Sequence, residues 1–293
     1  MCEEHYCKAA QAMHERSQPG TDSAATRLRI AACTGQHIGD RVEQQDRVGI
    51  FTSRRLPDSA LFVIADGMGG KTGGAMAARQ VMSTAKNLFT EYSVGDSIHS
   101  LLTEVVNEAH LVIRLSALST EKEPHSTIAA MVVQPHRADW AHVGDSRIYR
   151  FRGGKLSGRT TDHSYVEQLV NQGKLDAHDA HAHRLSNLLT HALGTNKQPS
   201  IDFGEVDGLT AGDTFLMCSD GLWHYFTDAE LAVVMATYPP RKASERLIAL
   251  ARERAEGGGD NCTLAIVRLE PADSGDLADS EIPAPVAERA PRF

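Results

Sequence analysis

Short apolar runs bounded by polar turn residues are the feature that most limits how this chain can fold. Runs of about four to eight apolar residues between turn residues are typical of β-strands. They fall into two main blocks, and most neighbouring runs are close enough to form hairpins. The predicted strands are Leu28–Ala32, Ala60–Ala65, Thr127–Val133, Ala138–Val143, Arg147–Phe151, Thr214–Cys218 and Cys262–Val267.

Helical patterns lie between the two blocks of strands and recur later in the chain. The predicted helices are Gly73–Thr90, Gly95–Ser119, Ser164–Gln172, Asp228–Ala236 and Arg241–Ala255. Because hairpins rather than single helices link most neighbouring strands, a doubly wound parallel sheet is disfavoured. We expect an α+β fold with a central antiparallel β-sandwich flanked by helices on both sides, in an α-β-β-α layering.

Composition excludes several classes of protein. The chain has 293 residues, of which 41% are apolar, so it can build a sizeable globular core. Its formal net charge of -8 argues against binding to nucleic acid or to a membrane surface, since such proteins cluster Lys and Arg. The sequence shows neither an apolar signal-peptide region nor a run of membrane-spanning length. Its cysteines have no metal-type spacing, and we expect a cytoplasmic protein.

Four aspartates stand at the ends of apolar runs. Asp66 ends LFVIAD, Asp220 ends TFLMCSD, Asp260 precedes CTLAIV, and Asp46 precedes VGIF. A sheet can hold such carboxylates in fixed positions while the loops leave them open to substrate. Hard divalent cations such as Mg²⁺ and Mn²⁺ prefer several oxygen ligands. The pattern therefore indicates a site where two such ions could share one aspartate and activate a bridging water.

Glycine and arginine residues near these acids fit the same site. Glycine occurs beside them in DGMGG, SDG and GGGDN, where it permits tight turns and could let the Gly67 carbonyl approach an ion. Any single Asp-Gly pair is explained by turn chemistry alone. Arg41, shortly before Asp46, could bind phosphate oxygens through two hydrogen bonds, although an arginine in a polar loop can equally be solvated.

Together these motifs resemble those of the metal-dependent type 2C Ser/Thr protein phosphatases of bacteria. The resemblance is carried, in order, by RVEQQD, DGMGGKTGGAMA, HSTIAAMVV, AHVGDSRIYR, TTDHSYVEQLVNQGKL, LTHALG, GDTFLMCSDGLW and GGGDNCTLAIV. The set covers nearly all of residues 27–270, which are the expected catalytic domain, with a flap at about 162–192. Residues 1–26 and 271–293 are polar, and we expect them to be disordered extensions.

The resemblance implies a role for each matching residue in metal binding. Asp66 is implied to bridge two metal ions, and Gly67 to offer its carbonyl oxygen. Asp220 and Asp260 are implied to bind the first ion. Asp46 is implied to act on the metal site largely through bound water.

The resemblance also implies a reaction. Arg41 falls on the phosphate-binding arginine, and Asp145 falls on an acid that can hold a third ion together with Asp220. The implied reaction is hydrolysis of phosphoserine and phosphothreonine by in-line attack of a metal-bridging hydroxide, at a centre of two Mn²⁺ or Mg²⁺ ions. The catalytic residues are then Arg41, Asp46 and Asp66. The implied partners are phosphorylated proteins that a cognate Ser/Thr kinase has modified, and the kinase itself, and we expect a monomer.

Several positions depart from the family pattern. Gln45 stands where many members have a glutamate ligand of the second ion, and it offers only a neutral carbonyl oxygen. Met68 stands where animal members have a histidine that protonates the leaving group, so that proton must come from elsewhere. His125 with Ser126, and likewise His191, replace residues usual in the family, which bears on local packing rather than on the metal site.

Two other functions stay open from the sequence. ADGMGGKT differs from a phosphate-binding P-loop by Ala65 in place of the first glycine. However, Asp66 would bring negative charge into a loop that wraps phosphates, and the repeated βαβ pattern is missing. The second alternative is a protein that binds phosphoproteins without turnover. The retained acids argue against it, whereas Gln45 leaves room for it.

Histidines and cysteines outside these motifs have simple explanations. The histidine-rich run at 178–191 repeats no ligand spacing, so we expect a solvated flap. A Cys-His-Cys set within residues 2–7 could bind a metal, but a disordered terminus is the simpler expectation. Cys218 and Cys262 lie within apolar strands, and we expect them to be small core residues rather than nucleophiles.

Overall fold

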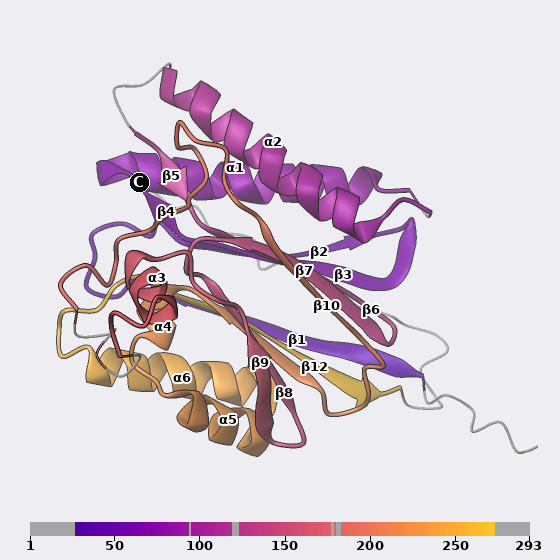
Figure 1. The fold of residues 1–293 in the computed structure, drawn as a ribbon. Coiled ribbons are helices and arrows are strands. Elements are labelled where there is room, and N and C mark those ends of the chain that lie inside the picture. The colour runs from indigo at the N-terminus through magenta and orange to yellow at the C-terminus, as the bar shows by residue number, and fades with distance from the viewer. Residues whose placement is uncertain (1–26, 94, 119–122, 177–178, 180–182, 273–293) are drawn as a thin grey trace, which may run out of the picture.

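Two antiparallel sheets form the centre of the molecule. The computed structural model describes residues 27–93, 95–118, 123–176, 179 and 183–272. In this part of the chain two five-stranded sheets stack face to face, and helices cover the outer face of each (Figure 1). Every pairing between the described strands is antiparallel. The predicted fold class, an α+β sandwich flanked by helices on both sides, is confirmed.

The first sheet has the strand order β1-β12-β11-β8-β9. Its strands are β1 (Leu28–His37), β8 (Arg147–Arg152), β9 (Lys155–Arg159), β11 (Thr214–Cys218) and β12 (Cys262–Pro271). Apolar side chains from three helices pack on its outer face. These helices are α4 (Asp220–Trp223), α5 (Asp228–Thr237) and α6 (Pro240–Arg254).

The second sheet has the strand order β10-β7-β6-β3-β2. Its strands are β2 (Arg47–Ser53), β3 (Leu56–Ala65), β6 (Ile128–Gln134), β7 (Arg137–Val143) and β10 (Asp202–Asp207). Two long helices cover its outer face, α1 (Gly70–Glu91) and α2 (Ile98–Leu118). The remaining elements are the short strands β4 (Gly67–Met68) and β5 (His125–Ser126) and the helix α3 (Tyr165–Asn171).

Strand β3 contributes to two hydrophobic cores at once. Ala60–Ala65 are all buried. Because successive side chains of a strand point to opposite faces, Phe62 and Ile64 pack between the sheets, whereas Leu61 and Val63 pack against the layer of α1 and α2. Burial of each such side chain contributes roughly 1.5–3 kcal/mol. A one-residue slip would exchange the two faces, so this packing fixes the end of β3 in space.

Local sequence signals set the starts of three helices. Thr227 and Glu230 form a reciprocal capping box at the start of α5. The Ser164 hydroxyl accepts a hydrogen bond from the Glu167 N–H at the start of α3. Helix α6 begins with Pro240, whose fixed φ suits the first helical turn. These signals explain why the predicted starts of these helices lie close to the observed ones.

The sequence patterns missed elements at the edges of the sheets. β9 and β10 are edge strands with mostly exposed side chains, so they lack the apolar runs that identify buried strands. For the same reason β1, predicted to end at Ala32, continues to His37 along a largely exposed edge. Helix α4, with four residues, is too short to show a helical period.

The loop between β3 and α1 does not belong to a parallel βαβ unit. β3 pairs antiparallel with both β2 and β6. A P-loop NTPase requires a strand-helix-strand crossover within a parallel sheet, and none occurs among the strands that the structure describes. The P-loop interpretation of ADGMGGKT is therefore wrong for this fold.

The predicted terminal extensions fall almost entirely outside the described residues. Pro271, the first residue of the predicted tail, is the last residue of β12 and pairs with Leu28. The first sheet thus extends one residue past the predicted limit, and the domain boundaries otherwise stay predictions. Among the helices of the described segments, none combines the length and apolar character that a membrane crossing requires.

Candidate metal centre

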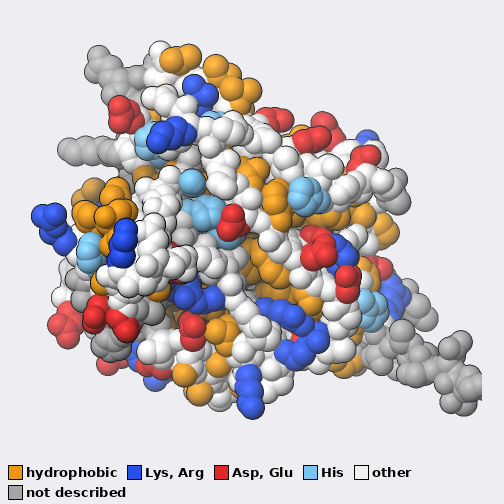
Figure 2. Space-filling view, in the orientation of Figure 1, with side chains coloured by type: hydrophobic (Ala, Val, Ile, Leu, Met, Phe, Trp, Pro, Cys, Tyr) orange, Lys and Arg blue, Asp and Glu red, His pale blue; other side chains and the backbone are white. Residues whose placement is uncertain are grey.

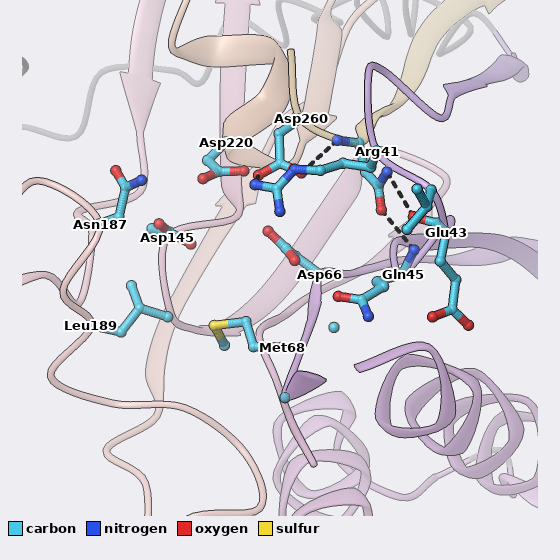
Figure 3. Close-up of a pocket in the computed structure, with 14 residues that line it drawn as sticks. Arg41, Glu43, Gln45, Asp66, Met68, Asp145, Asn187, Leu189, Asp220 and Asp260 are labelled. Carbon is cyan, nitrogen blue, oxygen red and sulfur yellow. Dashed lines mark hydrogen bonds and ion pairs between the residues drawn. The ribbon is translucent and has the colours of Figure 1, made fainter. Parts of the chain in front are cut away.

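An open cavity of about 490 Å³ lies where strand ends from both sheets meet (Figure 3). Six of the seven residues predicted for the site line it, namely Arg41, Asp66, Gly67, Asp145, Asp220 and Asp260. The other lining residues are Val42, Glu43, Gln45, Met68, Gly69, Asn187, Leu189 and Asn261. The fold therefore brings together acids that are far apart in the sequence, and among the predicted residues only Asp46 stands apart from the cavity wall.

Asp66 follows β3 and is held in place through its main chain. Its N–H donates to the Thr127 hydroxyl (3.0 Å), and its carbonyl accepts from the Thr127 N–H (2.8 Å) and the Ser126 hydroxyl (3.0 Å). These bonds tie the end of β3 to the start of β6. The Ser126 and Thr127 side chains thus fix the direction in which the Asp66 carboxylate leaves the sheet.

Gly67 occupies a place that only glycine fits. A Cβ atom at Gly67 would lie 2.1 Å from the carbonyl oxygen of Gly74 in α1, far inside van der Waals contact. The absence of this atom lets the chain pass directly from the acid to the long helix. The Gly67 backbone consequently forms part of the cavity wall.

Asp220 and Asp145 enter the cavity from the first sheet. Asp220 is the first residue of α4 and follows the end of β11. Asp145 follows Gly144, whose φ of 106° is a left-handed conformation that favours glycine. The Trp223 indole N–H donates to the Asp145 carbonyl (2.9 Å), so α4 supports the turn that carries the second acid.

A buried ion pair supports the same turn from behind. Arg147 donates to both carboxylate oxygens of Asp162 (2.8 and 2.7 Å) and to the Tyr149 hydroxyl (3.0 Å). Its guanidinium carbon lies 3.5 Å from the centre of the Trp223 ring, which is a cation–π arrangement. Nothing in the sequences VGDSR and TTDHS indicates that these two segments pair, so this network could not be predicted from them.

Arg41 and Asp260 lie opposite Asp66 at the open side of the cavity. The Arg41 guanidinium donates to the Asp260 carboxylate, and Figure 3 shows it extended over the space between Asp260 and Asp66. The Arg41 side chain is 59% exposed. It can therefore be reached by a ligand that enters from solvent.

Asn261 holds the loop that carries Arg41. Its side-chain amide donates to the carbonyls of Ile38 (2.7 Å) and Glu43 (3.1 Å), and its side-chain oxygen accepts from the Gln45 N–H (2.6 Å). Three contacts from one side chain fix the loop relative to β12. Sequence reasoning quoted GGGDN but did not single out this asparagine, although its place beside Asp260 was the available signal.

Asp46 is buried behind the cavity wall. It is 1% exposed, and its carboxylate accepts a hydrogen bond from the Ser219 hydroxyl (2.6 Å). Burial, reinforced by the charges of Asp220 and Asp260, raises the pKa of Asp46 to about 7 despite this bond. Its position suits an acid that acts on the cavity through neighbouring groups rather than by direct contact.

The acids of the cavity raise one another's pKa. Burial, followed by the charges of Asp46 and Asp220, raises the pKa of Asp66 well above its usual range. Burial also raises the pKa of Asp145, with Asp220 adding to the effect, and the pKa of Asp220, with Asp260 adding to it. Like charges that are buried together favour protonation unless a cation compensates them.

This donor set fits divalent cations of the Mg²⁺ and Mn²⁺ class. Such ions prefer carboxylate and carbonyl oxygens. The cavity offers the buried carboxylate of Asp145, the partly buried carboxylates of Asp66, Asp220 and Asp260, and the Gly67 backbone. A bound cation would also remove the cost of burying neighbouring negative charges. The lining residues and the charge they carry therefore agree with the predicted metal centre.

Flap residues complete one side of the cavity. Asn187 and Leu189, within the predicted flap 162–192, line it together with Met68. Asn187 lies outside the motifs that pointed to the site in the sequence, and Leu189 begins LTHALG, a motif without an acid. Within the histidine run, His183 accepts a hydrogen bond from Leu185 N–H. Two members of the run, His178 and His181, lie outside the described residues.

The buried cysteines behave as core residues. Cys218 and Cys262 pack in the hydrophobic core between the first sheet and its helices. Burial raises the pKa of the Cys262 thiol to about 12 and that of Cys218 well above its usual range. Neither thiol forms a reactive thiolate near neutral pH, which confirms the expected role of both residues. The Cys-His-Cys set within residues 2–7 lies outside the described part of the chain.

Comparison with known proteins gives one consistent family. The family described as protein phosphatase 2C matches residues 34–251. Protein phosphatase PhpP of Streptococcus pneumoniae is 28% identical to this chain over 241 residues, which cover 80% of this chain and 95% of PhpP.

Solved structures share the fold. A serine/threonine phosphatase of S. agalactiae superposes with a TM-score of 0.76 at 30% identity, covering 82% of this chain and all of that one. The catalytic domain of PstP, a serine/threonine protein phosphatase known from Mycobacterium tuberculosis, was solved in complex with two manganese ions. It superposes with a TM-score of 0.68 at 29% identity, covering 83% of this chain and 99% of that domain.

Proposed function

Because this chain belongs to the protein phosphatase 2C family, we propose that it is a metal-dependent phosphatase that hydrolyses phosphoserine and phosphothreonine in proteins at the cavity lined by aspartates. One observation carries the proposal. Asp66, Asp145 and Asp220 converge on an open cavity although burial and the charge of at least one other acid raise the pKa of each of them. Such an arrangement is costly for the protein alone and suits a metal-dependent hydrolase.

The metal ligands follow from the cavity lining. We propose that Asp66 bridges two ions, that the Gly67 carbonyl contributes to one of them, and that Asp220 and Asp260 bind the first. Asp145 would hold a third ion together with Asp220. When bound, Mn²⁺ or Mg²⁺ supplies Lewis-acid activation of water and neutralises charge on the phosphoryl group.

The other residues of the site have roles of their own. Arg41 would bind two phosphate oxygens and orient the phosphoryl group, exchanging its contact with Asp260 for the substrate. Asp46, through its hydrogen bond with Ser219, would fix the chain beside Asp220. Met68 has no proton to donate, so it serves as an apolar wall of the cavity.

The substrate and setting are also part of the proposal. We propose that the substrates are proteins phosphorylated by a cognate Ser/Thr kinase, including the kinase itself, and that the protein acts as a cytoplasmic monomer. The openness of the cavity supports a macromolecular substrate, because Arg41 and Asp260 both remain partly exposed at its mouth. A phosphorylated loop could therefore reach the acids without displacing the core.

The test is hydrolysis of an aryl phosphate and of a phosphothreonine peptide, with and without Mn²⁺. We expect activity that a chelator abolishes and that Asp66→Asn and Asp220→Asn abolish as well. Asp207→Asn is the matched control, because Asp207 lies exposed on β10 and pairs with Arg137, and it should retain full activity. Activity that survives both site variants or chelation contradicts the metal-dependent mechanism.

The same assay separates the alternatives. Binding of the phosphopeptide without turnover, in protein loaded with Mn²⁺, would support the phosphoprotein-binding module. ATP hydrolysis that depends on Lys71 would instead support an NTPase, a result that the antiparallel pairing of β3 does not predict.

A further inference from the structure

A second group of potential metal ligands lies outside the cavity. His142 in β7, His163 just before α3 and Asp202 at the start of β10 each offer one ligand atom, and these atoms all lie within 4.8 Å of one another. It is the only such group of three that the described residues contain. None of the three residues lines the cavity. The face drawn in Figure 2 shows histidine side chains next to a carboxylate near its centre.

The contacts of the neutral His142 ring favour the tautomer that a metal ligand needs. Its Nε2 lies 2.9 Å from the Thr161 carbonyl, and because a carbonyl only accepts, Nε2 carries the proton. Its Nδ1 therefore keeps a free lone pair. This atom is buried and has no hydrogen-bond partner among the described residues, in a side chain that is only 3% exposed. A buried lone pair without a partner is costly, and a metal ion would satisfy it.

His163 and Asp202 supply the other two donors and a route from solvent. His163 Nε2 lies 3.4 Å from the Asp202 carboxylate, whose side chain is 51% exposed. The rings of His142 and His163 stack with centroids 4.8 Å apart. Burial and the neighbouring His142 lower the pKa of His163, which keeps its imidazole neutral and available near pH 7.

One contact opposes metal binding and limits its strength. The Gly144 N–H donates a long hydrogen bond (3.3 Å) to His163 Nδ1. When Nε2 binds an ion, the ring proton moves to Nδ1, and this bond is lost. The consequence is an affinity weaker than that of a structural zinc site whose ligands are all supported by hydrogen bonds.

We propose that His142 Nδ1, His163 Nε2 and the Asp202 carboxylate form a binding site for a borderline divalent ion such as Zn²⁺, separate from the carboxylate cavity. Two imidazole nitrogens and one carboxylate suit Zn²⁺ or Co²⁺, with a fourth position left to water. The cavity, whose acidic ligands offer oxygen atoms, suits Mg²⁺ and Mn²⁺ instead. The two sites therefore select different metals.

The test uses the full-length protein in excess Mg²⁺, which occupies the oxygen-lined cavity. Co²⁺ is titrated in and followed by its visible absorption, which reports coordination by nitrogen and oxygen ligands. We expect one Co²⁺ per chain in the wild type, displaced by Zn²⁺. Asp202→Asn and His163→Asn should each weaken binding by at least about tenfold. Asp207→Asn, on the same strand and with the same loss of charge, should leave the affinity unchanged.

Two results would overturn the proposal. One is the absence of a Co²⁺ spectrum in the wild type at millimolar Co²⁺. The other is wild-type affinity in both Asp202→Asn and His163→Asn, which would place the ion elsewhere, for instance at residues 2–7 or in the run 178–191. Because Asp202 is largely exposed, Asp202→Asn tests the site even if a variant at a buried histidine does not fold.

Discussion

Two groups of aspartates in this protein have opposite surroundings. Asp162 and Asp213 each receive two hydrogen bonds from an arginine, Arg147 for the first and Arg152 for the second. Burial alone would raise the pKa of Asp213, but the hydrogen bonds from Arg152 leave it lowered. Asp66, which is partly exposed at the cavity wall, faces other carboxylates instead, and burial together with their charges raises its pKa.

The difference separates a structural acid from a functional one. A buried charge that the protein itself compensates holds elements together, as Arg147 does for β8 and the segment before α3. A carboxylate whose nearest charged neighbours are mostly other carboxylates, at the wall of an open cavity, is suited to bind a cation. Burial by itself does not distinguish the two groups, whereas the nature of the neighbours does.

The largest expected effect comes from a substitution among the aspartates that line the cavity. Asp66→Asn should lower kcat for an aryl phosphate by about 10³-fold or more, since metal-assisted catalysis supplies several kcal/mol. The variant should keep its fold, because the bonds that position Asp66 are main-chain bonds. Steady-state kinetics with saturating Mn²⁺, together with circular dichroism, checks both parts. A folded variant with wild-type kcat would show that Asp66 is not needed for catalysis and would contradict its assignment to the functional aspartates.

A substitution of one of the two arginine-paired aspartates, Asp162 or Asp213, should mainly lower the stability of the fold. Asp162→Asn leaves Arg147 buried without its counter-charge, which should lower the free energy of unfolding by about 3 kcal/mol or more. Urea unfolding of the wild type and the variant measures the effect. Since Arg147 also stacks on Trp223 and supports the turn of Asp145, activity should fall as well, by less than in Asp66→Asn. An unchanged midpoint of urea unfolding would show that the Arg147–Asp162 pair does not stabilise the fold.

The pH dependence of stability should differ in sign between the groups. The folded pKa of Asp46, about 7, lies above the value near 4 of an exposed carboxyl. The metal-free folded state therefore binds this proton more tightly than the unfolded state. Its contribution is lost as pH rises between about 4 and about 7, by at most about 1.4 kcal/mol per pH unit. Asp213, with a lowered pKa, loses its contribution instead as the pH falls.

Urea unfolding in chelator at pH 5, 6 and 7 measures this slope. Asp46→Asn should flatten it, whereas Asp207→Asn, a change at an exposed acid, should not. A wild-type stability that rises steadily across the same window would contradict the raised pKa.

Arg41→Ala should have the smallest effect. Loss of a hydrogen-bonded contact to the phosphate of the substrate, at an exposed position, should raise KM about tenfold and leave the free energy of unfolding nearly unchanged. Arg41→Lys, which keeps the charge but loses the paired geometry, should recover part of the affinity. If KM rises no more than in an exposed control such as Arg241→Ala, Arg41 does not bind the phosphate of the substrate.

The sequence predicted the acids of the cavity better than the residues that hold them in position. Asp66, Asp220 and Asp260 were found because they follow or precede short apolar runs, which are typical of buried strands. Asn261 and the Arg147–Asp162 pair were missed, because their partners are distant in sequence and a polar residue in a loop carries no periodic signal. The positions of such partners depend on tertiary packing.

The fold shows the same division. The central strand β6 is almost wholly buried, and the sequence predicted it to within one residue at each end. The sequence also predicted the buried part of β3 but missed its more exposed start at Leu56. Edge strands β9 and β10 are mostly exposed and polar, so their strand conformation comes from pairing with a neighbour rather than from their own residues.

Thermal unfolding of the wild type and Asp66→Asn, first in chelator and then in millimolar Mn²⁺, tests most directly whether the uncompensated aspartates form a cation site. In chelator the variant should melt at a higher temperature, because it lacks one of the repelling charges. In Mn²⁺ the wild type should become more stable than the variant. At a Mn²⁺ concentration a hundred times the Kd, binding should stabilise the wild type by about 2.7 kcal/mol relative to its own metal-free state. A variant that melts lower than the wild type in chelator, with equal shifts of both proteins in Mn²⁺, would contradict this account.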